Sequence, residues 1–349
     1  MSANLSTRAL GQNGPRVTTL GFGGAPLGNL YKQVSETEGR DTLDAAVRLG
    51  IRYFDTAPYY GFGLSERRLG DALRGRSDIV ISTKAGRLLT PAPDADTSCE
   101  RFGFVSPMPF EPLFDYSYDG ILRSHEHSLQ RLGVDRIDIL LVHDIGRTTH
   151  GETHSQRLAQ LVDGGGIRAL CQLREGKSVL AVGLGVNEVA ICLELMDRAR
   201  FDVLLLAGRY TLLEQTAIEG LMPRCEAEGV SVVIGGPFNS GILATGVSRI
   251  ANPRYNYDSA PASVRARVNR LEAVCSAHGV SIAAAALQFP LAHPAVASVI
   301  PGFASPAEVR AGVANFQTAI PDALWLDLRQ EQLIDVRAPV PRQAEAAVQ

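Results

Sequence analysis

Four side-chain types that can exchange protons with an oxygen atom occupy one kind of position in the sequence. Asp55 and Tyr60 stand in the stretch FDTAPYYG, Lys84 stands in STKAG, and His143 stands in LLVHD. Each stretch includes or follows a short run of β-branched, aromatic or other apolar residues, which is typical of a buried strand. The sequence therefore predicts a carboxylate, a phenol, an ammonium and an imidazole at points where a strand ends.

These four groups complement one another in proton transfer. A phenol has a pKa of about 10 in water, and a neighbouring ammonium lowers that pKa. We therefore expect Lys84 to favour the phenolate of Tyr60, while Asp55 keeps Lys84 charged and oriented. His143 is expected to orient a substrate oxygen and relay the proton. Tyr59 is the competing phenol, but the glycine that follows Tyr60 favours Tyr60. The set suits proton transfer to or from the oxygen of an alcohol or carbonyl.

The elements needed to bring these residues together repeat along the chain. Apolar strand candidates alternate with amphipathic helix candidates, which indicates an α/β fold with a parallel sheet buried on both faces. Eight such units favour a (β/α)8 TIM barrel over an open doubly wound sheet. In that barrel the carboxyl ends of all strands surround one pocket. The strands are expected at residues 20–24, 53–55, 79–83, 137–142, 179–182, 203–206, 230–234 and 296–300.

Two local features are predicted near the ends of these units. An N-terminal β-hairpin is expected over residues 8–18, with a tight turn at Asn13-Gly14. After the loop that carries the two tyrosines, Ser65 is expected to cap a helix, with Glu66 near its positive end.

Long segments outside the repeat are also informative. The loops 87–118 and 249–261 are expected on the carboxyl-end rim of the barrel, because long loops with aromatic residues are usually functional. We expect residues 1–336 to form a single domain and residues 337–349 to form a flexible tail. Phe102, Phe104, Arg209 and Tyr210 are candidates for shaping the substrate pocket.

Composition narrows the classes of function. The chain of 349 residues is 45% hydrophobic, with a formal net charge of -3, and no basic patch suggests nucleic-acid or membrane-surface binding. The start has no apolar leader, and no apolar run is long enough to span a bilayer, so a cytoplasmic protein without membrane partners is expected. Five scattered cysteines without a CxxC pair indicate reduced thiols and no zinc site.

The ordered motifs resemble those of the aldo-keto reductases. The resemblance rests on DTAPYYGFGLSERRLGDAL, STKAG, SLQRLGVDRIDILLVHD, GLGVN, GPFNSGIL and VIPGFASP, which extend over nearly the whole chain. It implies hydride transfer to or from a nicotinamide cofactor beside Tyr60, bound without a Rossmann fold. It also implies that Asn187 holds the carboxamide, and that the loop 236–243 and the segment after the last strand hold the phosphates and adenosine. The cofactor-binding residues expected from it are Gly24, Asn187, Gly236, Pro237, Phe238, Ser240, Gly302, Ser305 and Glu308.

Some positions depart from the usual pattern of that family. Val186 stands where a serine usually precedes the carboxamide-binding Asn, Ala207 replaces a glutamine, and Gly235 replaces the aromatic residue that stacks on the nicotinamide. Gly302 and Glu308 stand where members that prefer NADPH carry cationic residues. A 2′-phosphate would face a carboxylate there, so NAD is expected in preference to NADP. A shifted register would instead bring Arg310 to that phosphate.

An NAD preference favours oxidation, and the stretches LLLVHDIG, LLAGRYTLLEQ and GGPFNSGIL most resemble those of aldose 1-dehydrogenases. The expected reaction converts the anomeric hydroxyl of L-fucose, another D-threo-aldose or L-galactose to a lactone. Ala25 stands where many reductases carry a bulky tryptophan, which leaves room for a polar ring. The alternatives within the family are a pyridoxal 4-dehydrogenase and a general aldehyde or ketone reductase.

Two alternatives belong to other classes of function, and the oligomeric state stays open. A metal-dependent barrel hydrolase is suggested by His143, His150 and His154 together with Asp144. It would leave the tyrosine–lysine pair unexplained, and no HxH motif ends the first strand. The other alternative is a cofactor-sensing subunit without catalysis, and the complete set of four proton-exchanging residues argues against it.

Overall fold

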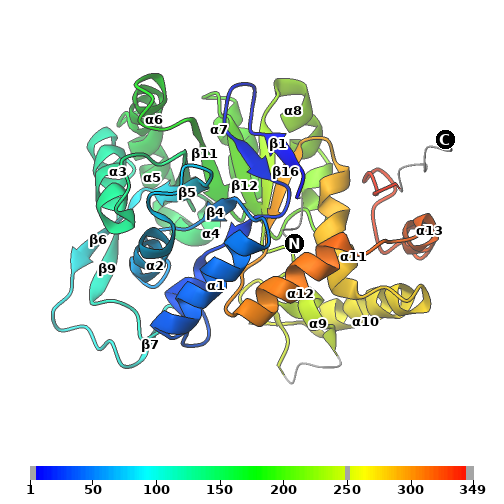
Figure 1. Ribbon diagram of the computed structural model, residues 1–349. Coiled ribbons are helices and arrows are strands. Elements are labelled where there is room, and N and C mark those ends of the chain that lie inside the picture. Colours follow the sequence, from blue (N-terminus) through cyan, green and yellow to red (C-terminus); the bar gives the residue numbers. More distant parts are fainter. Residues whose placement is uncertain (1–4, 248–251, 343–349) are drawn as a thin grey trace.

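Eight parallel strands form the centre of the computed structural model, which describes residues 5–247 and 252–342 (Figure 1). Backbone hydrogen bonds of 2.9 Å from Gly21 to Val299 and from Gly23 to Pro301 join the first strand to the last. The nearly closed (β/α)8 barrel confirms the predicted fold class. In spatial order the strands are β3 (Phe22–Gly23), β4 (Tyr53–Asp55), β5 (Val80–Ala85), β10 (Ile139–His143), β11 (Ala181–Val186), β12 (Val203–Ala207), β13 (Ser231–Gly235) and β16 (Val296–Ile300).

Helices cover the outside of this barrel, and Figure 1 shows α12 beside α1, so that the ring closes where the chain began. The helices before the seventh strand are α1 (Glu36–Arg48), α2 (Leu64–Leu73), α3 (Tyr118–Leu132), α4 (Arg147–His150), α5 (His154–Val162), α6 (Gly166–Glu175), α7 (Val189–Met196) and α8 (Leu221–Glu228). Those after it are α9 (Ile242–Thr245), α10 (Ala262–Ala277), α11 (Ile282–Gln288), α12 (Pro306–Gln317) and α13 (Asp322–Gln330). Short 3-10 turns lie at Ala25–Gly28, Gly151–Thr153, Thr216–Ile218 and Phe289–Ala292.

The two faces of each strand belong to two different cores. Successive side chains of a strand point to opposite faces, so Ile139 and Leu141 face the barrel interior while Leu140 and Val142 pack against helices. The same alternation places His143 on the inward face, because it lies two residues beyond Leu141. Asp55 likewise faces inward, because it lies two residues beyond the inward-facing Tyr53. Polar residues thus replace the apolar layers where the strands reach their carboxyl ends.

The predicted N-terminal hairpin covers the other end of the barrel. β1 (Thr7–Ala9) pairs with β2 (Arg16–Thr18), and Gly11 N donates to Ser231 Oγ at the start of β13 at 2.8 Å. The prediction of a tight turn at Asn13-Gly14 was wrong, because the pairing of β1 and β2 stops at Ala9 and Arg16. Leu10 leaves the ribbon to fill the barrel interior, and its backbone bonds to Pro15 and Gly14 close a wider loop.

The predicted start of α2 was also wrong by two residues. Gly63, at φ +97°, is the N-cap, and Ser65 lies in the first turn. Ser65 Oγ donates to the carbonyl of Gly24 at 2.7 Å and lies 2.8 Å from Thr56 Oγ1. Glu66 does lie in the first turn, but it is fully buried and accepts a hydrogen bond from Thr83. The serine therefore ties α2 to the barrel and caps nothing.

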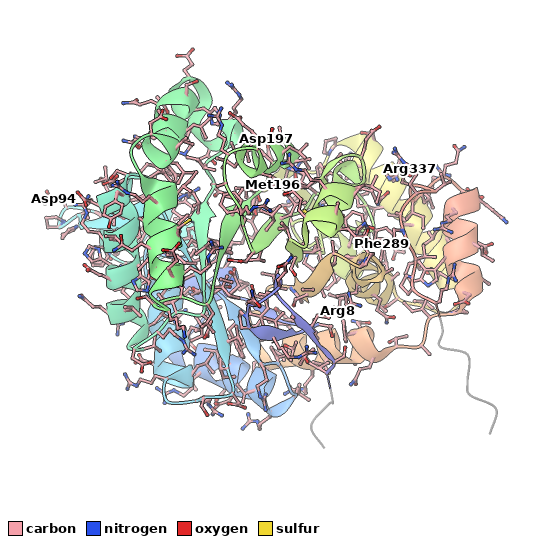
Figure 2. All side chains as sticks on the ribbon, turned by 90° about the horizontal axis from the view of Figure 1, so that it is seen from above. Arg8, Asp94, Met196, Asp197, Phe289 and Arg337 are labelled. Carbon is pink, nitrogen blue, oxygen red and sulfur yellow. The ribbon has the colours of Figure 1, made fainter. Side chains whose placement is uncertain are left out.

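Both long loops contain small antiparallel ribbons. In the first, β6 (Arg87–Pro91) pairs with β9 (Phe110–Phe114), and β7 (Glu100–Arg101) pairs with β8 (Phe104–Val105). In the second, β14 (Arg254–Tyr255) pairs with β15 (Asp258–Ser259), and residues 249–251 of that prediction lie outside the described chain. Both loops line the cavity at the carboxyl ends of the strands, as expected. In Figure 2, Asp94 of the first loop lies at the edge of the molecule.

Of the tail expected over 337–349, residues 343–349 lie outside the described chain. In the described part, Ala338 is buried and its carbonyl accepts a hydrogen bond from Arg329 at 2.7 Å. The flexible tail and the single domain stay predictions. All five cysteines are free thiols. Among the described residues, no single helix is long and apolar enough to cross a membrane; the stretch from α10 to Ala292 matches such a span in length and composition only across a 98° bend.

Candidate active site

A buried ion pair lies at the carboxyl ends of β4 and β5. Lys84 Nζ donates to Asp55 Oδ1 at 2.6 Å and to the carbonyl of Thr56 at 2.9 Å. Ser82 Oγ, on the same inward face as Lys84, also donates to Asp55 Oδ1 at 2.6 Å. Tyr53 OH lies 3.1 Å from Ser82 Oγ. The carboxylate is therefore held by two donors, and the ammonium cannot rotate freely.

Tyr60 lies above this pair, beside His143. The Lys84 nitrogen is 5.7 Å from the centroid of the Tyr60 ring, and the His143 ring meets Tyr60 edge-on with centroids 6.0 Å apart. A close backbone crossing holds the tyrosine there, since a Cβ added to Gly28 would lie 2.4 Å from the Tyr60 carbonyl carbon. The structure thus brings Asp55, Tyr60, Lys84 and His143 together, and their catalytic roles stay a proposal.

The protonation of the phenol differs from the expectation. Burial raises the pKa of Tyr60 well above its usual value, and Asp55 raises it further. Lys84 does not reverse this, because its ammonium is directed to Asp55 and to the Thr56 carbonyl. Burial also lowers the pKa of His143 well below its usual value, with Arg87 and Lys84 adding to the effect. Near neutral pH the site therefore holds a neutral phenol and a neutral imidazole.

Tyr59 packs against a second ion pair, between buried Arg87 and partly buried Asp144, which the sequence did not indicate. Arg87 lies 4.1 Å from the centroid of Tyr59 and 5.1 Å from that of Phe114, and it donates to Asp144 Oδ2. The same oxygen lies 3.5 Å from His143 Nε2. The available signal was position alone, since Arg87 comes three residues after Lys84 and Asp144 directly follows His143. The ring of Tyr59 is thus occupied by its contact with Arg87. This supports Tyr60 as the phenol that exchanges the proton.

A cavity of about 1050 Å³ opens above these residues. Phe102 and Phe104 line it, as expected, and Ala25 leaves space at its base. Tyr210 does not line it, because this side chain is buried against Phe289 and His293. The cavity wall is rich in aromatic rings and also carries charged groups at its mouth. The aromatic residues are Tyr31, Tyr59, Tyr60, Phe102, Phe104, Phe114 and Tyr257, and the charged residues at the mouth are Glu100, Glu111, Arg254 and Asp258.

A second cleft, of about 550 Å³, shares the wall at Tyr60 and Asn187 and extends toward α12. Of the predicted cofactor residues, all except Ser305 line it: Gly24, Asn187, Gly236, Pro237, Phe238, Ser240, Gly302 and Glu308. No side chain larger than that of glycine fits at Gly24, since a Cβ there would lie 2.6 Å from the Asp55 carbonyl oxygen. Ser305 instead caps α12 and accepts a hydrogen bond from Glu308 N at 3.2 Å.

The donor and acceptor groups of this cleft fit an extended dinucleotide. At the end near Tyr60, the Asn187 side-chain amide forms no hydrogen bond with the described residues, and the Asn187 carbonyl is fixed by Arg209 at 2.7 Å. At the other end, Glu308 accepts from Ala304 N at 2.7 Å and pairs with exposed Lys32 at 3.2 Å. Arg310 is exposed and does not line the cleft. The cleft therefore offers an amide to one end of a ligand and a carboxylate to the other.

The histidines considered for a metal site have other partners. His150 Nε2 lies 2.9 Å from Tyr116 OH, and His154 Nδ1 lies 3.1 Å from the Ile145 carbonyl. Within residues 5–247 and 252–342, no group of three or more histidine, cysteine or acidic side chains could hold a metal ion.

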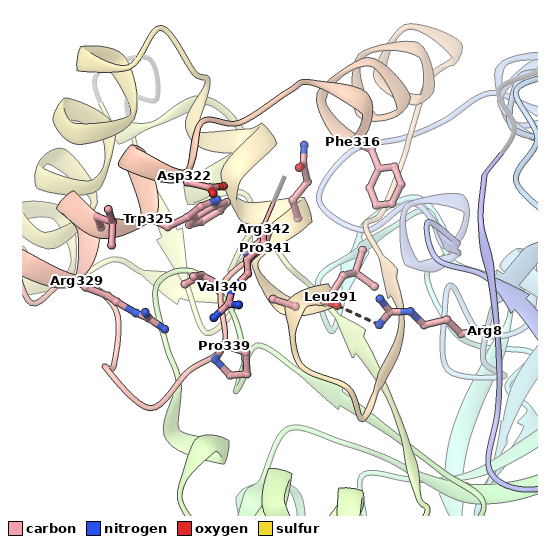
Figure 3. Close-up of a pocket in the computed structure, with 13 residues that line it drawn as sticks. Arg8, Leu291, Phe316, Asp322, Trp325, Arg329, Pro339, Val340, Pro341 and Arg342 are labelled. Carbon is pink, nitrogen blue, oxygen red and sulfur yellow. Dashed lines mark hydrogen bonds between the residues drawn. The ribbon is translucent and has the colours of Figure 1, made fainter. Parts of the chain in front are cut away.

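Another cavity, of about 840 Å³, lies between the N-terminal hairpin and α13 (Figure 3). Arg8, Trp325 and Arg329 line it, and Arg8 donates to the Leu291 carbonyl at 3.0 Å. It contains none of the site residues predicted from the sequence.

Comparison with known proteins agrees with this geometry. Residues 19–330 match the model of the Aldo/keto reductase family. The chain is 46% identical to pyridoxal 4-dehydrogenase from Microbacterium luteolum over 94% of this chain and 97% of that protein. It is 38% identical to D-threo-aldose 1-dehydrogenase from Pseudomonas sp, over 92% of this chain and 96% of that protein. A solved aldo-keto reductase from Bacillus halodurans, in its holo form, superposes with a TM-score of 0.72 and 26% identity, covering 97% of this chain and 99% of that one.

Proposed function

The chain belongs to the aldo/keto reductase family, and from this we propose that it is a nicotinamide-dependent dehydrogenase that oxidises a cyclic hemiacetal to a lactone. The observation that carries the proposal is the position of Tyr60, which lines both the aromatic cavity and the extended cleft. A substrate carbon in the first space and a hydride acceptor in the second would meet beside this phenol.

The four central residues divide the proton transfer among them. Tyr60, once deprotonated, takes the proton of the hemiacetal hydroxyl as the carbon–oxygen double bond forms and the hydride leaves the same carbon. Neutral His143 hydrogen-bonds the reacting oxygen and orients it. Lys84, fixed by Asp55, supplies the positive charge that stabilises the phenolate during the transfer. A bound nicotinamide supplies the hydride acceptor, and Asn187, the loop 236–240, Gly302 and Glu308 would hold it.

Two substrates share the chemistry that this site would perform. An aldose and pyridoxal each carry an aldehyde within reach of their own hydroxyl group, so both close to cyclic hemiacetals. The aldose assignment that we expected from the sequence is supported by the relatives named for D-threo-aldose and for L-galactose, the latter 30% identical and from Arabidopsis thaliana. Pyridoxal is supported by the relative with 46% identity and by the aromatic wall, which suits a flat ring.

We propose NAD as the preferred cofactor because of the charge at the far end of the cleft. Glu308 faces the cleft there, and a 2′-phosphate in its vicinity would be repelled. Lys32 partly neutralises this carboxylate, and solvent screens both charges, since the side chains of Lys32 and Glu308 are 57% and 44% exposed; the repulsion that remains favours NAD by a moderate factor. The ribose hydroxyls of NAD, in contrast, can donate hydrogen bonds to a carboxylate.

The proposal is tested by assaying purified protein with L-fucose, L-galactose and pyridoxal, each with NAD and with NADP. We expect reduced-nicotinamide absorbance to rise in step with lactone, which is detected by mass spectrometry, and to be insensitive to chelators. Oxidation of none of these hemiacetals, with turnover of open-chain aldehydes or ketones only, would refute the lactone-forming reaction. Hydrolysis without cofactor, inhibited by chelators, would instead indicate the metal-dependent class.

A further inference from the structure

Asp144 occupies a strained position at the substrate cavity. Its φ of +45° lies in the left-handed region that residues other than glycine rarely adopt, and such strain is concentrated at functional sites. The backbone is held there by the hydrogen bond from Asp144 N to the Gly185 carbonyl at 2.9 Å. This turn at the end of β10 places the carboxyl group in the wall of the cavity, directly beside His143.

Only one of the two carboxylate oxygens is occupied. Oδ2 accepts the hydrogen bond from Arg87 and lies 3.5 Å from His143 Nε2. No described residue donates a hydrogen bond to Oδ1. The side chain is 17% exposed and lines the cavity, so a ligand in the cavity can approach this oxygen. Arg87 in turn cannot move away easily, because Tyr59 and Phe114 both contact its guanidinium. The unoccupied acceptor is therefore held in a fixed direction.

On the basis of the proposed function, we infer that Asp144 accepts a hydrogen bond from the substrate hydroxyl on the carbon next to the reacting carbon. His143 hydrogen-bonds the reacting oxygen of the substrate. The Asp144 carboxylate, which lies beside this imidazole, is then within reach of the neighbouring hydroxyl oxygen of the same substrate. The pair with Arg87 balances the charge of Asp144, so the subsite selects a neutral hydroxyl donor and not a cation. In an aldose this donor is the 2-hydroxyl; in pyridoxal the nearest hydroxyl donor, at position 3, lies one carbon further from the reacting carbon.

Charged groups elsewhere on the cavity wall do not offer the same contact. Glu111 is 66% exposed at the rim and lies 3.7 Å from Arg101, while Glu100 on β7 and Asp258 on β15 are exposed. Lys84 and Asp55 are occupied by each other. Asp144 is thus the carboxylate that combines a partly buried position, a fixed orientation and contact with His143.

The test compares two substrates and three proteins. Wild type, Asp144→Asn and the control Glu111→Gln are each assayed with the hemiacetal that wild type oxidises best and with its analogue lacking the neighbouring hydroxyl, such as 2-deoxy-L-fucose for L-fucose. We expect wild type and Glu111→Gln to favour the hydroxylated substrate about 10- to 100-fold in kcat/KM. In Asp144→Asn this ratio should fall about 5-fold or more, because a neutral amide replaces the carboxylate acceptor and the parent substrate alone loses the charge-assisted hydrogen bond.

Several outcomes would overturn the inference while leaving the proposed reaction intact. Equal loss for both substrates in Asp144→Asn would make the residue a structural partner of Arg87. Wild type that oxidises the deoxy analogue as efficiently as the parent would refute the contact without any variant, which covers the case in which Asp144→Asn fails to fold. Failure of wild type to oxidise any hemiacetal would instead refute the proposed function.

Discussion

Lys84 Nζ and Asp55 Oδ1 lie 2.6 Å apart at the ends of two neighbouring strands, in side chains that are 1% and 2% exposed. A buried ion pair contributes little net stability compared with an apolar pair, but removing one partner leaves an uncompensated charge. Here that geometry fixes the ammonium beneath the Tyr60 ring. The pair therefore links the stability of the barrel to the chemistry of the proposed active site.

Lys84→Met should test both roles of this pair. We expect loss of most dehydrogenase activity and destabilisation of about 3–5 kcal/mol at neutral pH, because Asp55 is left buried without its partner. Loss of Lys84 raises the folded-state pKa of Asp55, so the penalty is small below its unfolded value and grows as the pH rises above that value. Urea denaturation at pH 5 and pH 8 checks this. Lys84→Met combined with Asp55→Asn should recover most of the stability, and no recovery would contradict the account.

Tyr60→Phe should lower kcat by about 10²- to 10⁴-fold, since it removes the group that exchanges the proton. Binding of the cofactor, followed by fluorescence titration, should be nearly unchanged. Tyr59→Phe is the matched control, because phenylalanine keeps the ring that Arg87 packs against, and it should cost less than about 5-fold. The assignment would be reversed if Tyr59→Phe were the more damaging of the two.

The rate of oxidation should rise with pH across the range from 7 to 10. The pKa of Tyr60 is raised, so the phenolate needed as base is a minor species throughout that range, and its fraction increases up to tenfold per pH unit. The pKa of His143 is lowered, so this imidazole is already neutral at pH 7 and adds no limb near pH 6.5. A profile of kcat/KM against pH measures both effects. A plateau reached below pH 8 would show that the phenol ionises more easily than its burial implies.

Glu308→Gln should improve the use of NADP and leave the use of NAD nearly unchanged. The amide oxygen can still accept the hydrogen bond from Ala304 N, so the local fold is kept while the charge is removed. We expect the KM for NADP to fall about 5- to 20-fold, the range expected for one repulsion at a partly exposed site. Glu152→Gln, an exposed charge outside the cleft, is the control. An unchanged ratio of the two KM values would remove Glu308 from cofactor selection.

Two helical glycines provide a test of the packing around the barrel. A Cβ on Gly70 of α2 would lie 2.1 Å from the Leu132 carbonyl oxygen of α3, whereas a Cβ on Gly39 of α1 would meet nothing closer than 3.5 Å. Gly39→Ala should therefore stabilise the protein by up to about 1 kcal/mol through helix propensity. Gly70→Ala should destabilise it by about 1–3 kcal/mol or more through overpacking. Thermal denaturation of the two variants should move in opposite directions.

Local patterns in the sequence were sufficient to predict the framework of this protein. Strands in a barrel have one inward face with a period of two, so a polar residue at the last inward position can be recognised from the sequence alone. That is why Asp55, Lys84 and His143 were expected to lie near one another. The apolar runs and their alternation with helices likewise predicted the barrel, because both depend on residues that are neighbours in the chain.

The tertiary structure decided everything that depends on partners distant in sequence. Ser65 looked like a helix cap until the carbonyl of Gly24 proved to be its acceptor, and Tyr210 looked like a pocket residue until Phe289 covered it. The same holds for protonation, since the raised pKa of Tyr60 comes from burial and from the direction in which Lys84 points. Neither the contact of Arg87 with Asp144 nor the cavity that they line has a local signature. Such contacts are set only when the strand ends converge, because burial and charge pairing are properties of the assembled barrel.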